Sequence, residues 1–143
     1  MLKVLLPVDG SKSATRATKK LIKTLGWYKE QPTIELLTVH LPVPRFPNMR
    51  VVVSNEMLER YYAEECKDML APSRKVLDAA GVKYTVHTLV GSIAESIIGH
   101  AKRSGSDMIY MGTRGMTALS NMVLGSVTTR VLHLAHIPVV LIH

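Results

Sequence analysis

The sequence predicts an α/β fold in which five parallel strands form one sheet with helices on both faces. Two observations predict it. Short apolar runs alternate along the chain with segments of helical periodicity, and no linker, repeat or change of composition divides the 143 residues. Parallel strands need crossover connections of about a dozen residues or more, which the helical segments supply. We therefore expect residues 1–143 to form a single domain.

Five segments are expected to be strands because they are short, largely apolar and bounded by turn residues. They are residues 2–8, 33–40, 82–91, 107–112 and 137–143. If the first three strands wind one way and the last two the other, the strand order is 3-2-1-4-5. Ligands of such sheets bind beyond the carboxyl ends of the strands, where the winding direction reverses. The loops that follow the first and fourth strands are therefore expected to face one crevice.

Apolar residues at helical spacing predict a helix in each connection. The first helix is expected to end at Gly26, the second to cover residues 55–80, the third to end near Gly105, and the last to begin near Val127. Pro72 lies inside the second helix and is expected to kink or interrupt it, because proline lacks the N–H donor and clashes with the preceding turn.

Composition and charge exclude several classes of function. The net charge is +7, but the basic residues are scattered, and there are only one Trp, five Tyr and one Phe to interleave with them. A nucleic-acid partner is therefore not expected. No apolar run approaches the roughly 18 residues of a membrane span. The first strand lacks a signal-peptide cleavage site, so we expect a cytoplasmic protein. The single cysteine excludes an internal disulfide.

The stretch MGTRGMTALSNMVLGSV, residues 111–127, holds Gly112, Gly115 and Gly125 between the fourth strand and the last helix. Glycine lets backbone N–H groups approach an anion, and a helix that starts at the last glycine favours negative charge. The Ser126 hydroxyl can donate to a phosphate oxygen. The spacing is neither a Walker loop nor the dinucleotide G-x-G-x-x-G pattern. Glycine chemistry alone leaves a phosphate loop and plain turns equally open.

The spacing G-x2-G-x9-G-S is nevertheless that of a known family. With VLLPVDGS near the start, GSIAESIIGHAKRSGSDMIYMGTRG in the middle and LGSVTTRVLHLAHIPVVLI at the end, the whole chain resembles the universal stress protein family and, within it, the ATP-binding branch. The resemblance implies a Rossmann-like fold and a nucleotide-dependent regulatory role in stress response. It also implies a homodimer that pairs through the final strand, which would otherwise be an open apolar edge.

The resemblance also implies roles for particular residues. Asp9 would approach the ribose, the phosphates or a bound Mg²⁺ ion, and Val39 would contact adenine. The full set of implied ATP-binding residues is Pro7, Val8, Asp9, Val39, Met111, Gly112, Thr113, Gly115, Gly125, Ser126 and Val127. Asp9 could also form an Asx-turn or a helix cap, and both roles could hold together, whereas Val39 could instead belong to the core. Met116 departs from the basic residue that is frequent in relatives, and Arg114 could replace that charge or be solvated.

Other chemistry is sparse in the sequence. No residue stands out as a general base for a water that attacks a γ-phosphate. Two alternatives therefore accompany the binding module: a weak Mg²⁺-dependent ATPase, and an interaction protein of the same fold that binds no nucleotide. His133 and His136 share a helix face without a carboxylate partner, and the other four histidines, among them His87 and His100, are isolated along the chain. The expected metal is thus Mg²⁺ carried with the nucleotide at Asp9.

Overall fold

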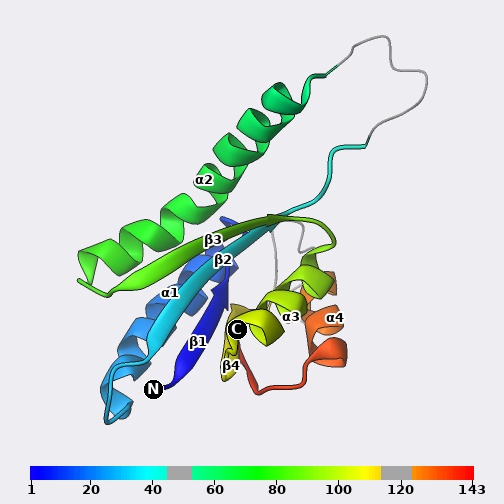
Figure 1. The fold of residues 1–143 in the computed structure, drawn as a ribbon. Helices are drawn as coiled ribbons and strands as arrows, with labels where there is room; N and C mark the ends of the chain where they lie inside the picture. The colour runs from blue at the N-terminus through cyan, green and yellow to red at the C-terminus, as the bar shows by residue number, and fades with distance from the viewer. Residues whose placement is uncertain (45–52, 114–123) are drawn as a thin grey trace.

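The computed structural model describes residues 1–44, 53–113 and 124–143. In them, parallel strands form a five-stranded sheet of order β3-β2-β1-β4-β5. The strands are β1 Lys3–Pro7, β2 Thr33–His40, β3 Tyr84–Val90, β4 Met108–Gly112 and β5 Val139–Ile142 (Figure 1). The predicted strand order and parallel pairing are confirmed, and every strand end lies within two residues of the predicted one.

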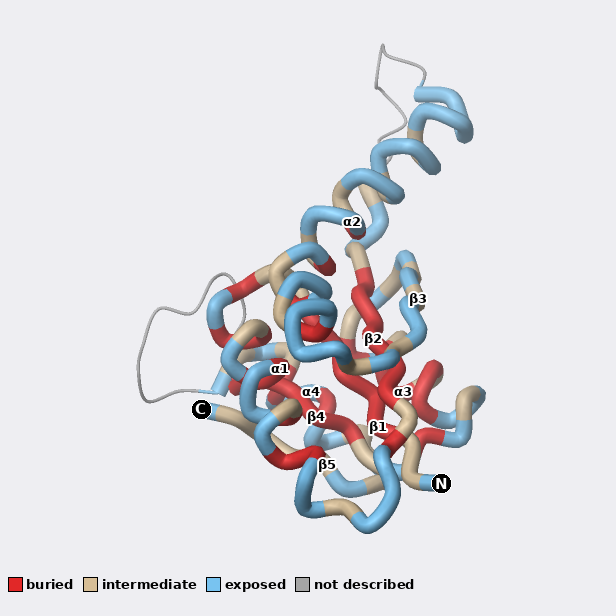
Figure 2. Tube along the Cα trace, turned by 90° about the vertical axis from the view of Figure 1, so that its left-hand side faces the viewer, coloured by how far each residue is buried: buried red, intermediate tan, exposed pale blue. Residues whose placement is uncertain are grey.

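Helices cover both faces of the sheet, as predicted (Figure 1). The pair α1 Lys12–Thr24 and α2 Asn55–Ala79 packs on one face, and the pair α3 Ile93–Ser104 and α4 Ser126–Leu134 packs on the other. The amino-terminal half of α2 projects beyond the sheet (Figures 1 and 2). None of the helices in the described part of the chain is long and apolar enough to cross a membrane.

Two apolar clusters, one on each face of the sheet, form the core. Along β1, Val4 and Leu6 face α1 and α2, whereas Leu5 faces α3 and α4. The inner strands β1, β2 and β4 are buried on both faces, which explains why their sequences are largely apolar, with Glu35 and Thr38 as buried polar residues of β2. Figure 2 shows this burial along the middle of the sheet, with edge strand β3 much more exposed.

Gly26 does not end α1 in the way predicted. The α-helix stops at Thr24, and a 3₁₀ turn, Leu25–Trp27, continues the chain with Gly26 in its middle. Among the described glycines, Gly10, Gly81 and Gly105 have positive φ angles and Gly26 does not. The last turn of α1 tightens from i→i−4 to i→i−3 bonding, which satisfies terminal carbonyls without a left-handed residue.

Pro72 does not interrupt α2, so the prediction of an interruption is wrong. The helix runs from Asn55 to Ala79 as one element with Pro72 inside it. Buried residues bracket the proline: Leu70 lies before it, and Ser73 follows with its hydroxyl 2.9 Å from the Thr18 hydroxyl of α1. A proline inside a helix costs about 3 kcal/mol. Packing of the helix on both sides of Pro72 therefore outweighs the local penalty.

Candidate functional site

The turn after β1 is held by its own side chains. The Ser11 N–H donates to Asp9 Oδ1 at 2.9 Å, which is an Asx-turn, and the Ala14 N–H donates to Ser11 Oγ at 3.1 Å. Ser11, rather than Asp9, is therefore the N-cap of α1. Gly10 between them has φ +83°, and a Cβ there would lie 3.2 Å from Met69 Cα of α2. The turn is fixed at the carboxyl end of β1, with Asp9 partly exposed.

The end of β4 packs directly against the start of α1. A Cβ on Gly112 would lie 2.8 Å from the Ser13 carbonyl oxygen and 2.9 Å from its carbonyl carbon, both closer than real Cβ atoms come. Only glycine fits this contact. The contact places the beginning of the glycine-rich loop beside the β1–α1 turn. This agrees with the prediction that the loops after the first and fourth strands face one crevice.

The two described ends of the glycine-rich loop are tied together. The Gly125 N–H donates to the Thr113 carbonyl at 2.7 Å, and the Thr113 N–H donates to the Ile142 carbonyl of β5 at 3.1 Å. The Thr128 hydroxyl of α4 donates to the Gly112 carbonyl at 3.2 Å. These bonds hold the start of α4 against the ends of β4 and β5.

Helix α4 begins at Ser126, with Gly125 as its N-cap. Glycine has no side chain, so the N-cap residue itself makes no side-chain bond to the first-turn N–H groups of α4, and Ser126 beside them is exposed. Gly115, together with Arg114 and Met116, lies outside the described residues.

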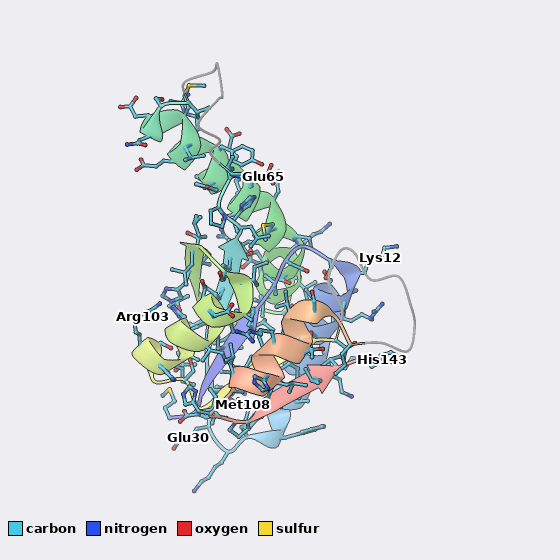
Figure 3. The ribbon with its side chains drawn as sticks, turned by 90° about the vertical axis from the view of Figure 1, so that its right-hand side faces the viewer. Lys12, Glu30, Glu65, Arg103, Met108 and His143 are labelled. Atoms are coloured by element: carbon cyan, nitrogen blue, oxygen red, sulfur yellow. The ribbon has the colours of Figure 1, made fainter. Side chains whose placement is uncertain are left out.

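Two helices thus begin at the same end of the sheet. Neither α1 nor α4 has an acidic residue in its first turn. The Asp9 carboxylate that accepts from the Ser11 N–H lies at the positive end of the α1 dipole, whereas the first turn of α4 contains no acidic side chain. In Figure 3, Lys12 at the start of α1 and His143 after β5 lie at this end, away from Met108 at the start of β4. The arrangement favours an anion, and Asp9 adds a carboxylate suited to a divalent cation that accompanies it.

Several predicted residues are also part of the core. Val39 is 4% exposed and Met111 6% exposed, and both side chains pack in the cluster beneath α3, with Val127 against it. The Leu37 carbonyl accepts from Val8 N–H at 2.8 Å, so the backbone of Val39, two residues on, faces the β1 side as well. Pro7 is buried opposite Leu37. Because the Val39 side chain is buried in the core, an adenine base could contact only the backbone of Val39.

A hollow of about 230 Å³ lies elsewhere, between α2 and β3. Its lining comprises Glu59, Tyr62, Ala63, Cys66, Thr88, Leu89 and Val90, and none of these is a predicted site residue. Burial raises the pKa of the Cys66 thiol, so at neutral pH this group is a neutral part of the lining.

The structure also brings together residues that the sequence left apart. His87 of β3 and His100 of α3 have ring centroids 4.6 Å apart, and His100 Nε2 lies 3.1 Å from Glu35 Oε2 of β2. The two histidines are distant in the sequence but adjacent in the folded protein, so the prediction that they are isolated is wrong. No sequence spacing signals this cluster, because it depends on the register of β2 with β3 and on the return of α3 across them.

Glu35 of this cluster is a buried carboxylate, 8% exposed. Burial alone raises the pKa of its carboxyl, but hydrogen bonds with Ser104 and His100 and the charge of Lys3 together outweigh it, so the pKa lies below its ordinary value. The Lys3 ammonium is 3.7 Å from Glu35 Oε1 and donates to the Ser104 carbonyl at 2.7 Å. Glu35 is therefore ionised at neutral pH.

Comparison with known proteins identifies the class to which this fold and site belong. The model of the universal stress protein family matches residues 1–143. The chain belongs to the universal stress protein family.

Two curated relatives come from Methanocaldococcus jannaschii. Universal stress protein MJ0531 is 30% identical over 141 residues, which cover 98% of this chain and 81% of the relative. Universal stress protein MJ0577 is 30% identical over 157 aligned positions, covering 98% of this chain and 93% of the relative.

Solved structures share the fold. That of MJ0577 has a TM-score of 0.77 at 27% identity, covering 99% of this chain and 94% of the other. A universal stress protein in complex with cAMP has a TM-score of 0.69 at 19% identity, with coverages of 99% and 97%. One from Archaeoglobus fulgidus in complex with dAMP has a TM-score of 0.64 at 19% identity, with coverages of 100% and 98%. The likeness to these last two, at such identity, establishes the fold.

Replacing Gly112 by alanine should destabilise the protein by about 1–3 kcal/mol, because the new methyl group would overlap the Ser13 backbone. Urea unfolding measures the change. Gly26→Ala is the matched control, since a Cβ at Gly26 meets nothing within 4 Å, and it should leave stability unchanged or raise it slightly. Equal stability of the Gly112→Ala variant and the unmodified protein would contradict the packing role of Gly112.

Replacing Glu35 by glutamine should cost about 1–3 kcal/mol at neutral pH, because Lys3 and His100 lose a charged partner. The folded-state pKa of Glu35 lies below the ordinary 4.5. Its contribution is therefore present above pH 4.5 and lost as the pH falls through the folded-state pKa. Unfolding free energies of the two proteins should converge in acid.

Glu95→Gln removes a carboxylate from an exposed pair with Arg130 and serves as the control, with a smaller effect at neutral pH. A difference between Glu35→Gln and the unmodified protein that stays constant into acid would show that the charge of Glu35 does not stabilise the fold.

Proposed function

We propose that this protein binds ATP at the carboxyl end of its sheet and acts as a nucleotide-dependent regulatory module in stress response. One observation carries the proposal: a loop with the G-x2-G-x9-G-S spacing begins at Gly112 against α1 and ends at Gly125 as the N-cap of α4. Its ends are held together by the Gly125–Thr113 hydrogen bond. Such a loop presents backbone N–H groups to an anion.

In this proposal the phosphates lie over the start of α4, where the Ser126 hydroxyl and first-turn N–H groups donate to them. Gly115 allows the loop backbone to approach. Asp9 holds Mg²⁺ together with the phosphates, using Oδ2 while Oδ1 keeps its bond to the Ser11 N–H. Pro7, Val8 and the backbone of Val39 line the adenine and ribose side, and Met111, Thr113 and Val127 support the pocket from below.

Two kinds of support come from related proteins. The solved universal stress proteins in complex with cAMP and dAMP hold adenine nucleotides on the same fold. MJ0577, whose structure was used to assign a biochemical function, aligns along nearly its whole length. An adenine nucleotide is thus the ligand class that the fold has accommodated, and the glycine spacing of this chain favours a nucleotide that carries several phosphates.

Calorimetric titration with ATP and Mg²⁺ tests the proposal. The unmodified protein should bind one ATP per chain, and Gly115→Val should abolish binding because a side chain blocks the approach of the backbone. Asp9→Asn retains an oxygen that accepts from Ser11 but loses the charge. It should weaken binding of Mg²⁺–ATP about tenfold, roughly 1.4 kcal/mol, and leave binding of metal-free ATP unchanged.

Absence of binding to any adenine nucleotide, with no thermal shift, would leave the interaction protein without nucleotide as the better description. Normal ATP binding by Gly115→Val would refute the phosphate loop while leaving nucleotide binding intact. Phosphate release that stops in Asp9→Asn would favour the weak ATPase.

We further propose a homodimer that pairs through β5, which forms one edge of the sheet. Alternate residues of a parallel strand bond to the same neighbour. The carbonyls of Pro138 and Ile142 accept from β4 and its extension, so the backbone of Val139 and Leu141 points to the open edge.

Leu141→Pro removes a backbone N–H donor that points to the open edge, and it should convert the dimer to monomers in sedimentation velocity. Leu141→Ala loses the same packing but keeps the donor and should stay dimeric; monomers in both variants would contradict pairing through the β5 backbone.

A further inference from the structure

We propose that Glu35, His87 and His100 form a binding site for a divalent transition-metal ion of the Zn²⁺ class. The site lies on the α3 side of the sheet, at the β2–β3 edge, and is separate from the loops that the nucleotide proposal uses. One ligand atom from each of the three side chains can be chosen so that all lie within 4.8 Å of one another.

Two of the ligands already have the spacing that a metal requires. His100 Nε2 and Glu35 Oε2 are 3.1 Å apart. Two ligands of a tetrahedral zinc ion, each bound at about 2.0–2.1 Å, are separated by about 3.3 Å. The ring of His87 lies with its centroid 4.6 Å from that of His100. A small rotation of the partly exposed His87 side chain completes a three-ligand set.

The backbone holds the three residues in this arrangement. Glu35 pairs in register with Thr85, and Leu37 with His87, so Glu35 and His87 stand on the same face of adjacent strands, two residues out of step. Helix α3 crosses that face and supplies His100, which is 9% exposed. The ligands thus come from three elements that the fold itself positions, and binding orders little new structure.

The cluster contains one carboxylate that suits a cation and one ammonium group that competes with it. Glu35 supplies a carboxylate that is ionised at neutral pH, and its Oε1 faces Lys3 at 3.7 Å while Oε2 faces His100. The Lys3 ammonium is the competing positive charge. Its hydrogen bond to the Ser104 carbonyl holds it beside Glu35 Oε1, the oxygen that does not face His100. The Thr85 hydroxyl lies 3.3 Å from His87 Nε2 and can orient the ring once the metal is bound through Nδ1.

The ligand types select the metal. Two imidazoles and one carboxylate suit Zn²⁺, and also Co²⁺, Ni²⁺ or Cu²⁺, whereas Mg²⁺ and Ca²⁺ prefer oxygen ligands alone. Glu35 and His100 are buried, but His87 stands on an edge strand and is partly exposed. Solvent therefore reaches the site from the His87 side, where a water can take the fourth position.

The test uses tag-free protein stripped of metal with a chelator and then titrated with Zn²⁺ or Co²⁺ in the absence of nucleotide. The unmodified protein should bind one equivalent, and bound Co²⁺ should show the intense visible bands of a tetrahedral site. His87→Ala leaves the buried Glu35–His100 pair in place, so it should fold normally and bind at least about 100-fold more weakly. His133→Ala, which removes an exposed histidine from α4, is the matched control and should bind as the unmodified protein does.

Zn²⁺ should also raise the unfolding temperature of the unmodified protein and of His133→Ala, but not of His87→Ala. Equal affinity of His87→Ala and the unmodified protein for both ions would overturn the site. Failure of the unmodified protein to bind either Zn²⁺ or Co²⁺ would overturn it as well. Because the ions are added without nucleotide, neither result depends on whether the protein binds ATP.

Discussion

The contact between the end of β4 and the start of α1 is the constraint on which the arrangement of loops and helix starts at the carboxyl end of the sheet depends. Gly112 lies so close to the Ser13 backbone that no side chain fits between them. This approach puts the β1–α1 turn and the beginning of the glycine-rich loop side by side. The Gly112 carbonyl then accepts from Thr128, and Thr113 bonds to Gly125 and Ile142, so the start of α4 is held to the same place. The starts of two helices and the ends of three strands, β1, β4 and β5, are thus held together by this contact and the hydrogen bonds around it.

The strand order and the layers could be predicted because they rest on patterns that a sequence displays. Strands β1, β2 and β4 are buried on both faces and are largely apolar, and the helices carry their apolar residues at helical spacing. The local rules for Gly26 and Pro72 failed because each describes a residue in isolation. Pro72 stays helical because Leu70 and Ser73 on either side of it are buried against neighbouring elements, and no local rule includes that energy.

The candidate site likewise has features that the sequence shows and features that only the folded structure shows. The spacing of Gly112, Gly125 and Ser126 is visible in the sequence, and so is their position at the switch point. That Gly112 serves packing as well as any ligand is not visible, because the neighbour it must accommodate, Ser13, is distant in the chain. The cluster of Glu35, His87 and His100 was missed for the same reason: its members approach only when β2 and β3 pair in register and α3 crosses them.

The two clusters of polar groups lie on one sheet but are held by different parts of it. Glu35 is near the start of β2, beside Lys3 at the start of β1, whereas the loops that carry Asp9 and Gly112 leave the other ends of the strands. The elements that join them are α3, which supplies His100, and α4, which follows the glycine-rich loop in the chain. These helices pack on each other and share the Arg130–Glu95 ion pair. An ion at the histidine cluster would fasten α3 to the exposed edge strand β3, and anything bound at the start of α4 would act on the helix beside it. The α3–α4 layer is thus the part of the fold that lies between the two groups of residues.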